Sequence, residues 1–134
     1  MYLLESSRQA ENTWMVASTL GKLGDLAQGQ MLYEVAQHHY QESLALKQSL
    51  DDKEGAAVLL AQLGSTAVFQ QDFANARAYL QDSLSKMTEL KSEQGIALAQ
   101  YHLALLEQAE NHLSKARALL KKNLNTFSTP KSIA

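Results

Sequence analysis

The sequence repeats itself with a period of forty residues. When the chain is shifted by forty positions, small and apolar residues coincide in three successive copies. The coinciding sets are Ala17, Ala57 and Ala97; Leu23-Gly24, Leu63-Gly64 and Leu103-Ala104; Ala36, Ala76 and Ala116; Tyr40, Leu80 and Leu120; and Leu44, Leu84 and Leu124. A fixed period of this length indicates a repeat architecture, in which each unit buries its apolar face against the next unit.

Each copy contains two stretches with the spacing of an amphipathic helix. In the first copy, Leu20, Leu23, Gly24 and Ala27 follow the i, i+3, i+4, i+7 spacing of one helical face, and strand signals are absent. Good N-cap residues also recur at the predicted helix starts, at Asn12, Asp52, Ser92 and Ser132, and at Asp72 and Asn111 for later second helices. We predict first helices over 13–29, 53–69 and 93–109, and second helices over 32–49, 72–89 and 112–127.

Gly64 stands in the middle of one predicted helix, where glycine is less favourable than alanine by about 1 kcal/mol. It lies on the face that must pack against the second helix of its pair, which offers Ala76 at the crossing. Two small residues allow two helix backbones to approach closely. We therefore predict that Gly64 packs at Ala76. The equivalent pairs are Gly24 with Ala36, and Ala104 with Ala116.

These residues resemble the tetratricopeptide repeat family, whose pattern is W-x2-L-G-x2-Y followed by A-x3-F. The first copy reads Leu20-x2-Leu23-Gly24-x2-Ala27 with Ala36-x3-Tyr40, the second reads in the same way forty residues later, and the third is the weakest match. The resemblance covers residues 12–127 and implies an all-α fold, a right-handed TPR-like α-solenoid of three antiparallel helix pairs. The implied single domain, 1–134, divides into the tail of a preceding repeat helix (1–11), three repeats (12–51, 52–91, 92–129) and a C-terminal tail (130–134).

The forty-residue period is similar to the long-helix variety found in kinesin light chains and in bacterial signalling regulators. The asparagines that often flank the Leu-Gly pair in that variety are missing here, as is the Lys/Asn set of relatives that clamp a C-terminal carboxylate. The resemblance implies a non-enzymatic scaffold that binds a peptide or helix of a partner protein in its concave groove. It also suggests that the chain is a fragment of a larger bacterial regulatory protein.

In such solenoids the first helices line the concave surface, so residues offset from their buried stripes are candidates for partner binding. The candidates are Asp25, Val58, Ser65, Leu98, Tyr101 and Leu105. A mixed apolar and polar surface of this kind suits an amphipathic helix or an extended peptide. The alternative for Val58, Leu98 and Leu105 is that they pack between adjacent repeats.

A second functional hypothesis is self-association. The ends of the repeat array carry no polar caps, which solenoids normally need. The segment AQGQMLYEVA between the first two predicted helices has only Gly29 as a helix breaker. Residues 13–49 could therefore straighten into one helix and exchange the first hairpin between two chains, giving a homo-oligomer.

Composition excludes several other functions. The net charge is −2, but residues 111–134 carry +5, so the remaining 110 residues carry −2 − 5 = −7. An acidic body without interleaved aromatic residues argues against nucleic-acid binding. Glu34 and His38 could supply two metal ligands, fewer than zinc needs, and no catalytic or cofactor motif occurs. The chain lacks cysteine, a signal peptide and a long apolar run, so we expect no membrane contact, no cofactor and a cytoplasmic location.

Overall fold

The computed structural model describes residues 2–127, with side chains for residues 7–122, and this part of the chain is all-α. It contains α1 (Tyr2–Gly29), α2 (Tyr33–Ser49), α3 (Lys53–Phe69), α4 (Phe73–Glu89) and α5 (Glu93–Phe127). The predicted helices ending at 29, 49, 69 and 89 therefore end where the sequence indicated. The fold class is a TPR-like solenoid, as the forty-residue period predicted.

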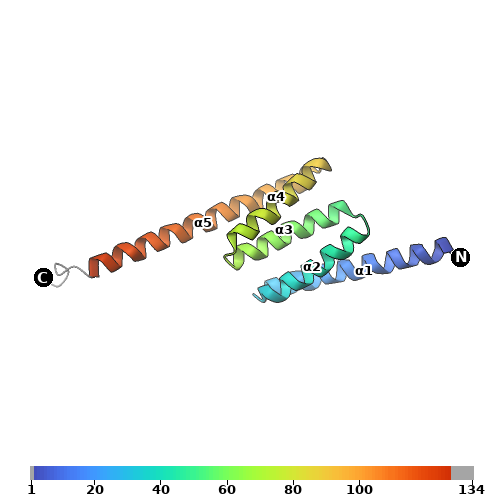
Figure 1. Cartoon of the computed structure of the whole chain (residues 1–134), viewed down its shortest axis with the longest axis horizontal. Coiled ribbons are helices and arrows are strands. Elements are labelled where there is room, and N and C mark those ends of the chain that lie inside the picture. Colours follow the sequence, from blue (N-terminus) through green and yellow to red (C-terminus); the bar gives the residue numbers. More distant parts are fainter. Residues whose placement is uncertain (1, 128–134) are drawn as a thin grey trace.

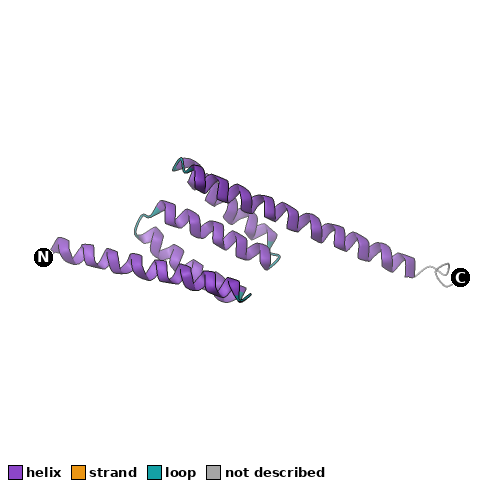
Figure 2. Cartoon of the chain, turned by 180° about the vertical axis from the view of Figure 1, so that it is seen from behind, coloured by secondary structure: helices purple, strands orange, loops and turns teal. Residues whose placement is uncertain are grey.

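The helices pack in the order in which they follow one another. α1 packs on α2, α2 on α3, α3 on α4 and α4 on α5, and α3 also contacts α5 directly (Figure 1). The view from behind shows the same stack, with α3 in its middle (Figure 2). The first helices α1, α3 and α5 run in the same direction, so one end of α1 and the opposite end of α5 extend beyond the stack.

Four turns of one kind separate the five helices. Each contains a non-glycine residue with positive φ, and these residues recur every twenty positions: Met31, Asp51, Gln71 and Lys91, with φ between 54° and 63°. The N–H of the next residue bonds the carbonyl five residues earlier, as in Leu32 to Ala27 at 2.9 Å and Asp72 to Ala67 at 2.9 Å. This is the Schellman arrangement, which satisfies the carbonyls at the end of a helix and reverses the chain.

Helix starts follow the predicted caps where a turn precedes them. The carboxylate of Asp52 accepts from the N–H of Gly55 at 2.9 Å, and the hydroxyl of Ser92 accepts from the N–H of Gly95 at 3.1 Å. Asp72 caps α4 through Asn75 in the same way. Leu32 occupies the equivalent position before α2 and provides no side-chain cap.

The glycine at position 64 is explained by close helix crossing. A Cβ atom on Gly64 would lie 2.5 Å from Cγ of Leu80 and 3.4 Å from the carbonyl oxygen of Ala76, so a side chain there would collide with α4. At Gly24 the nearest atoms belong to the ring of Tyr40 rather than to Ala36. The predicted close approach is confirmed, but a large side chain of the second helix fills the space that each glycine leaves.

Buried serines reinforce both closed hairpins. The hydroxyl of Ser43 donates to the carbonyl of Ala17 at 2.6 Å, and that of Ser83 donates to the carbonyl of Ala57 at 2.7 Å. Both serines are almost fully buried, and both alanines are at 0% exposure. The small side chain of alanine lets the second helix come near enough to bond to the backbone of the first.

The prediction of a third antiparallel pair is wrong. Residues 93–127 form one continuous helix, so 93–109 and 112–127 do not fold onto each other and Ala104 does not face Ala116. Asn111 occupies the position equivalent to Met31 and Gln71 but lies inside the helix instead of starting one. Ala109 and Glu110 favour helix here, and Arg77 of α4 pairs with Glu110, which ties this part of α5 to the stack.

One prediction about the N-terminal part is also corrected. Asn12 lies within α1, so the expected tail of a preceding helix and the first helix of repeat one form a single helix. Residues 29–32 form a closed turn in the single chain, and the exchange of this hairpin between two chains stays a hypothesis. Ser132 and the tail 130–134 lie outside the described residues.

Candidate functional site

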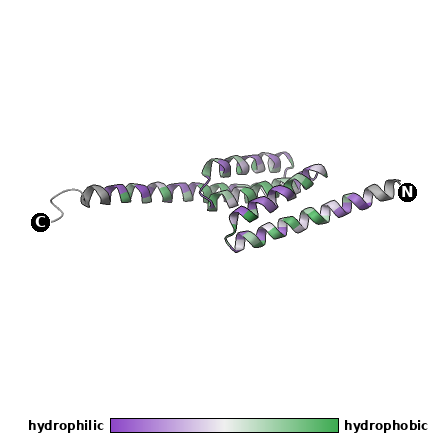
Figure 3. Cartoon of the chain, turned by 60° about the horizontal axis from the view of Figure 1, so that its bottom comes forward, coloured by the Kyte–Doolittle hydropathy of each residue, from purple (hydrophilic) through white to green (hydrophobic). Residues whose placement is uncertain are grey.

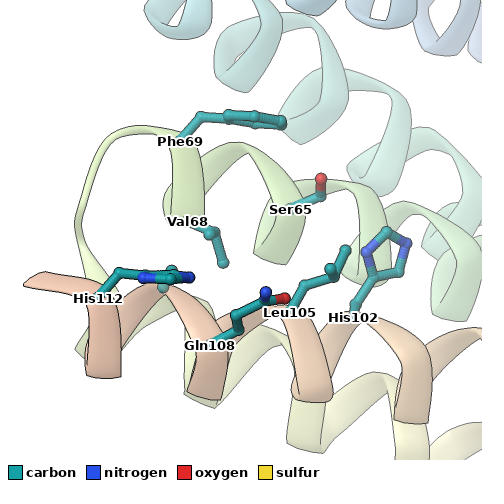
Figure 4. Close-up of a pocket in the computed structure, with 8 residues that line it drawn as sticks. Ser65, Val68, Phe69, His102, Leu105, Gln108 and His112 are labelled. Carbon is teal, nitrogen blue, oxygen red and sulfur yellow. The ribbon is translucent and has the colours of Figure 1, made fainter.

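A groove of about 300 Å³ opens between the first helices of the second and third repeats. α3 contributes Ser65, Val68 and Phe69 to its walls, and α5 contributes His102, Leu105, Gln108, Ala109 and His112. In Figure 4, Val68 points from α3 toward α5, Leu105 and His102 point from α5 toward α3, and Phe69 lies at the far side of α3. The helical periodicity explains this set, because residues three or four apart share one face of a helix.

The interior of the groove is mainly apolar. Val68 of α3 and Leu105 of α5 line it from opposite helices, and Phe69 lies at its edge with 55% of its surface exposed. Burial lowers the pKa of His102, because the desolvated ring favours its neutral form. A neutral imidazole adds no charge to the wall, so the groove presents a surface suited to apolar side chains with a few polar groups at its edge.

A second hollow lies on the other side of α3, next to α1. Its lining is more polar and consists of Asp25, Gln28, Gly29, Tyr40 and Phe69. Phe69 borders both hollows, and its ring stacks on that of Tyr33 with centroids 5.2 Å apart and planes 2° apart. The two hollows therefore form one surface that crosses the C-terminal end of α3.

Polar side chains connect α1 to α3 within this second hollow. The carboxylate of Asp25 accepts from the hydroxyl of Tyr40 at 2.5 Å and from the amide of Gln62 at 3.0 Å. Thr66 donates to the amide oxygen of Gln28 at 2.6 Å. Burial, together with the hydrogen bond to Asp25 and its charge, raises the pKa of Tyr40 well above its usual range, so the tyrosine stays protonated and donates.

Comparison with known families places these repeats. The family model described as tetratricopeptide repeat matches residues 15–89, which is more than half of the chain and includes both closed hairpins. The chain belongs to the tetratricopeptide repeat family. Repeats of this family generally mediate protein–protein interactions. No curated protein matches the chain at significant similarity.

In this tetratricopeptide repeat protein, the predicted partner-binding residues separate into four locations. Ser65 and Leu105 line the groove between α3 and α5. Asp25 borders the hollow beside α1, where its carboxylate already accepts two hydrogen bonds. Leu98 and Tyr101 are exposed on α5 outside both linings, and Val58 is half-buried on α3. The structure thus brings two of the six candidates together.

The sequence reasoning missed several groove residues of the repeat protein. Phe69 was assigned no role, although an aromatic residue stands there where the other copies have Gly29 and Ala109. His102 and His112 were not among the predicted site residues, yet both lie in the groove wall. The signal that could have found Phe69 was this departure from the repeat pattern at the end of a first helix.

Within the described residues, the repeat protein contains no cluster of three or more histidine, aspartate or glutamate side chains that could hold a metal ion. His38 pairs with Glu42 at 2.5 Å on the exposed face of α2. In the same part of the chain, no helix has both the length and the hydrophobicity to cross a membrane.

Proposed function

We propose that the chain is a scaffold that binds an amphipathic helix or peptide of a partner protein in the groove between α3 and α5. The observation that carries this proposal is that Val68, Phe69 and Leu105 line one mainly apolar hollow between α3 and α5. A side chain that enters the hollow would lose its contact with water, which stabilises binding by about 25 cal/mol per Å² of apolar surface.

The shape of the surface supports a helix or extended peptide over a small molecule. The polar hollow beside α1 shares Phe69 with the groove, so apolar anchors could lie next to α5 while polar groups face Gln28. An amphipathic helix presents both kinds of side chain along one face. The network around Asp25 holds α1 at a fixed distance from α3 and keeps this surface preorganised.

The proposal can be tested by panning a library of helix-forming peptides with apolar residues at i, i+3, i+4 and i+7 against the chain. Selected peptides should bind wild type, and Leu105→Gln should weaken binding by roughly tenfold because a partly buried apolar contact is lost. Leu90→Gln is the matched control, since Leu90 is 39% exposed and Leu105 37% exposed, and Leu90 lies outside the groove. Equal loss in both variants, or no loss in Leu105→Gln, would contradict the proposal.

The period of the repeats also supports a role within a larger bacterial regulator, acting in the cytoplasm. This part of the proposal rests on the resemblance to the long-helix variety of the family. Sequencing the reading frame around the gene tests it, and a flanking ATPase or DNA-binding segment is the expected result. A flanking secretion signal or an unrelated enzyme domain would overturn it.

A further inference from the structure

The second half of α5 projects from the stack as an isolated helix. Every side chain from residue 114 to residue 122 is exposed, and Figure 1 shows this end of α5 running past the other helices. Leu119 and Leu120 are 61% and 63% exposed, whereas Tyr40 and Leu80, which are equivalent to Leu120, are 1% and 0% exposed. The projecting segment therefore carries apolar side chains that no other part of the described chain covers.

Exposed residues form a stripe along α5 from residue 98 to residue 119. Leu98, Leu105, His112 and Leu119 follow one another at intervals of seven, and all four are exposed. Tyr101 and Ala116 are exposed on the same face between them. Figure 3 shows hydrophobic positions recurring along the projecting part of this helix. A seven-residue spacing drifts slowly around a straight helix, which suits left-handed pairing with a second helix.

Charge divides α5 into two opposite halves. Residues 93–110 contain Glu93, Glu107 and Glu110 and no lysine or arginine, which gives −3. Residues 111–122 contain Lys115, Arg117, Lys121 and Lys122 and no acid, which gives +4. When two such helices are antiparallel with Leu119 of one beside Leu98 of the other, Lys121 lies within about one turn of Glu93 of the other helix, which favours the pair. Glu107 and Glu110 then lie near the centre of the pair, where Glu110 is already paired with Arg77 of α4. A parallel pair would place like charges together.

We propose that α5 pairs with α5 of a second copy of this chain, antiparallel and around a two-fold axis near residues 108–110. The projecting half of each copy lies along the first half of the other, so that Leu119 of one copy packs near Leu98 of its partner. The stripe is self-complementary under this rotation, as a two-fold interface requires. The proposal rests on the proposed function, because the incoming helix uses the groove wall at Leu105, Gln108 and His112.

The net charge of residues 1–110 also favours a second copy of this chain as the binding partner. Residues 1–110 carry −7, so the basic segment of one copy is attracted to the whole body of the other and not only to its α5. The groove edge formed by Val68 and Phe69 lies beside the first half of α5, where the partner helix passes. This contact would cover apolar surface on both the body and the projecting helix.

The chain has no cysteine, so single cysteines can report the arrangement directly. Full-length Leu98→Cys and Leu119→Cys proteins are prepared separately, treated with a short bismaleimide alone or after mixing, and separated by denaturing electrophoresis. A cross-linked dimer should form only in the mixture, because equivalent residues 98 of an antiparallel pair are about 30 Å apart at 1.5 Å per residue. Cross-linking of each variant with itself indicates a parallel pair, and no cross-linking indicates a monomer; either result overturns the proposal.

Sedimentation equilibrium on the full chain measures the strength of the contact. Leu119→Gln should raise the dimer dissociation constant on the order of a hundredfold, because two buried leucines are lost per dimer. Ser114→Gln, which lies about 140° around the helix from Leu119 at 3.6 residues per turn, should leave it unchanged. Equal association of wild type and Leu119→Gln would contradict the proposal.

Peptide binding separates this proposal from the proposed function. Leu119 lies outside the groove, so the selected peptides should bind Leu119→Gln at least as well as wild type. Peptide binding with no dimer in any variant overturns the self-pairing alone. The proposed function is overturned if the selected peptides neither dissociate the dimer nor bind to Leu119→Gln.

Discussion

Single residues set the distance between the helices of each repeat. The side chain missing at Gly64 leaves room for Leu80, and the one missing at Gly24 leaves room for the ring of Tyr40. Glycine weakens an isolated helix by about 1 kcal/mol relative to alanine. Here that cost is offset by the burial of a leucine or tyrosine, which stabilises the pair by about 1.5–3 kcal/mol.

Gly64→Ala is therefore expected to destabilise the protein, although alanine favours helix. The new Cβ would lie 2.5 Å from Leu80, and such overpacking typically costs about 1–3 kcal/mol. Urea denaturation followed by circular dichroism measures the loss. The matched control is Gly29→Ala, because an added Cβ at Gly29 meets no atom within 4 Å and its φ is not positive. A neutral Gly64→Ala would show that α3 and α4 adjust freely.

Individual helices depend on the turns that precede them. The backbone angles of Leu32 (φ −91°, ψ 71°) and Asp72 (φ −91°, ψ 72°) are nearly the same, yet only Asp72 accepts a hydrogen bond from its helix. α2 therefore begins without a side-chain cap. The backbone of its turn already has the conformation that a capping residue needs. The sequence suggested that this turn is weak. The turn is closed in the single chain, and what it lacks is a side chain that caps α2.

Leu32→Asp should consequently stabilise the protein by about 1 kcal/mol, the usual gain from a good N-cap. The carboxylate would accept from the N–H of Val35, as Asp72 does from Asn75. Thermal unfolding should show a higher midpoint. Asp72→Leu is the reciprocal variant, and it should lose a similar amount. A lower midpoint for Leu32→Asp would mean that the exposed leucine makes a contact that stabilises the protein more than the cap does.

The molecule as a whole is held together by contacts between neighbouring helices. α3 packs against α2, α4 and α5, whereas α1 has its main contacts with α2 alone. The largest clusters of buried apolar residues both include residues of α3, Leu59 and Leu63 in one and Ala61 and Ala67 in the other. Stability in such stacks is close to a sum of local terms, so it should be greatest at the centre.

Hydrogen exchange monitored by mass spectrometry should therefore be slowest for the amides of α3. Exchange should be faster in α1, and fastest in residues 114–122 of α5 when the protein is dilute, because every side chain of that segment is exposed. Raising the protein concentration should slow exchange in the projecting segment alone if α5 pairs with a second copy. Equal protection of α1 and α3 would contradict this order of local stabilities.

Local sequence determined α2, α3 and α4, four of the helix ends and the family. The caps at Asp52, Asp72 and Ser92 depend only on residues close in the chain. The apolar periodicity and the small residues at the helix crossings recur with the repeat. Both kinds of feature can therefore be recognised from the sequence alone. Ser65 and Leu105 could be placed on one surface for the same reason, because equivalent residues of successive repeats lie side by side.

Tertiary structure decided the third repeat and the shape of the groove. Residues 112–124 carry the pattern of a second helix, but whether the chain turns at residue 111 depends on the balance between closing a hairpin and continuing a helix tied to α4 by Arg77 and Glu110. That balance involves contacts distant in sequence. The position of Phe69 at the junction of two hollows depends on such contacts too, since its ring rests on Tyr33 of another repeat. The repeat period specifies which faces are apolar, and only the packed chain determines which of them remain uncovered.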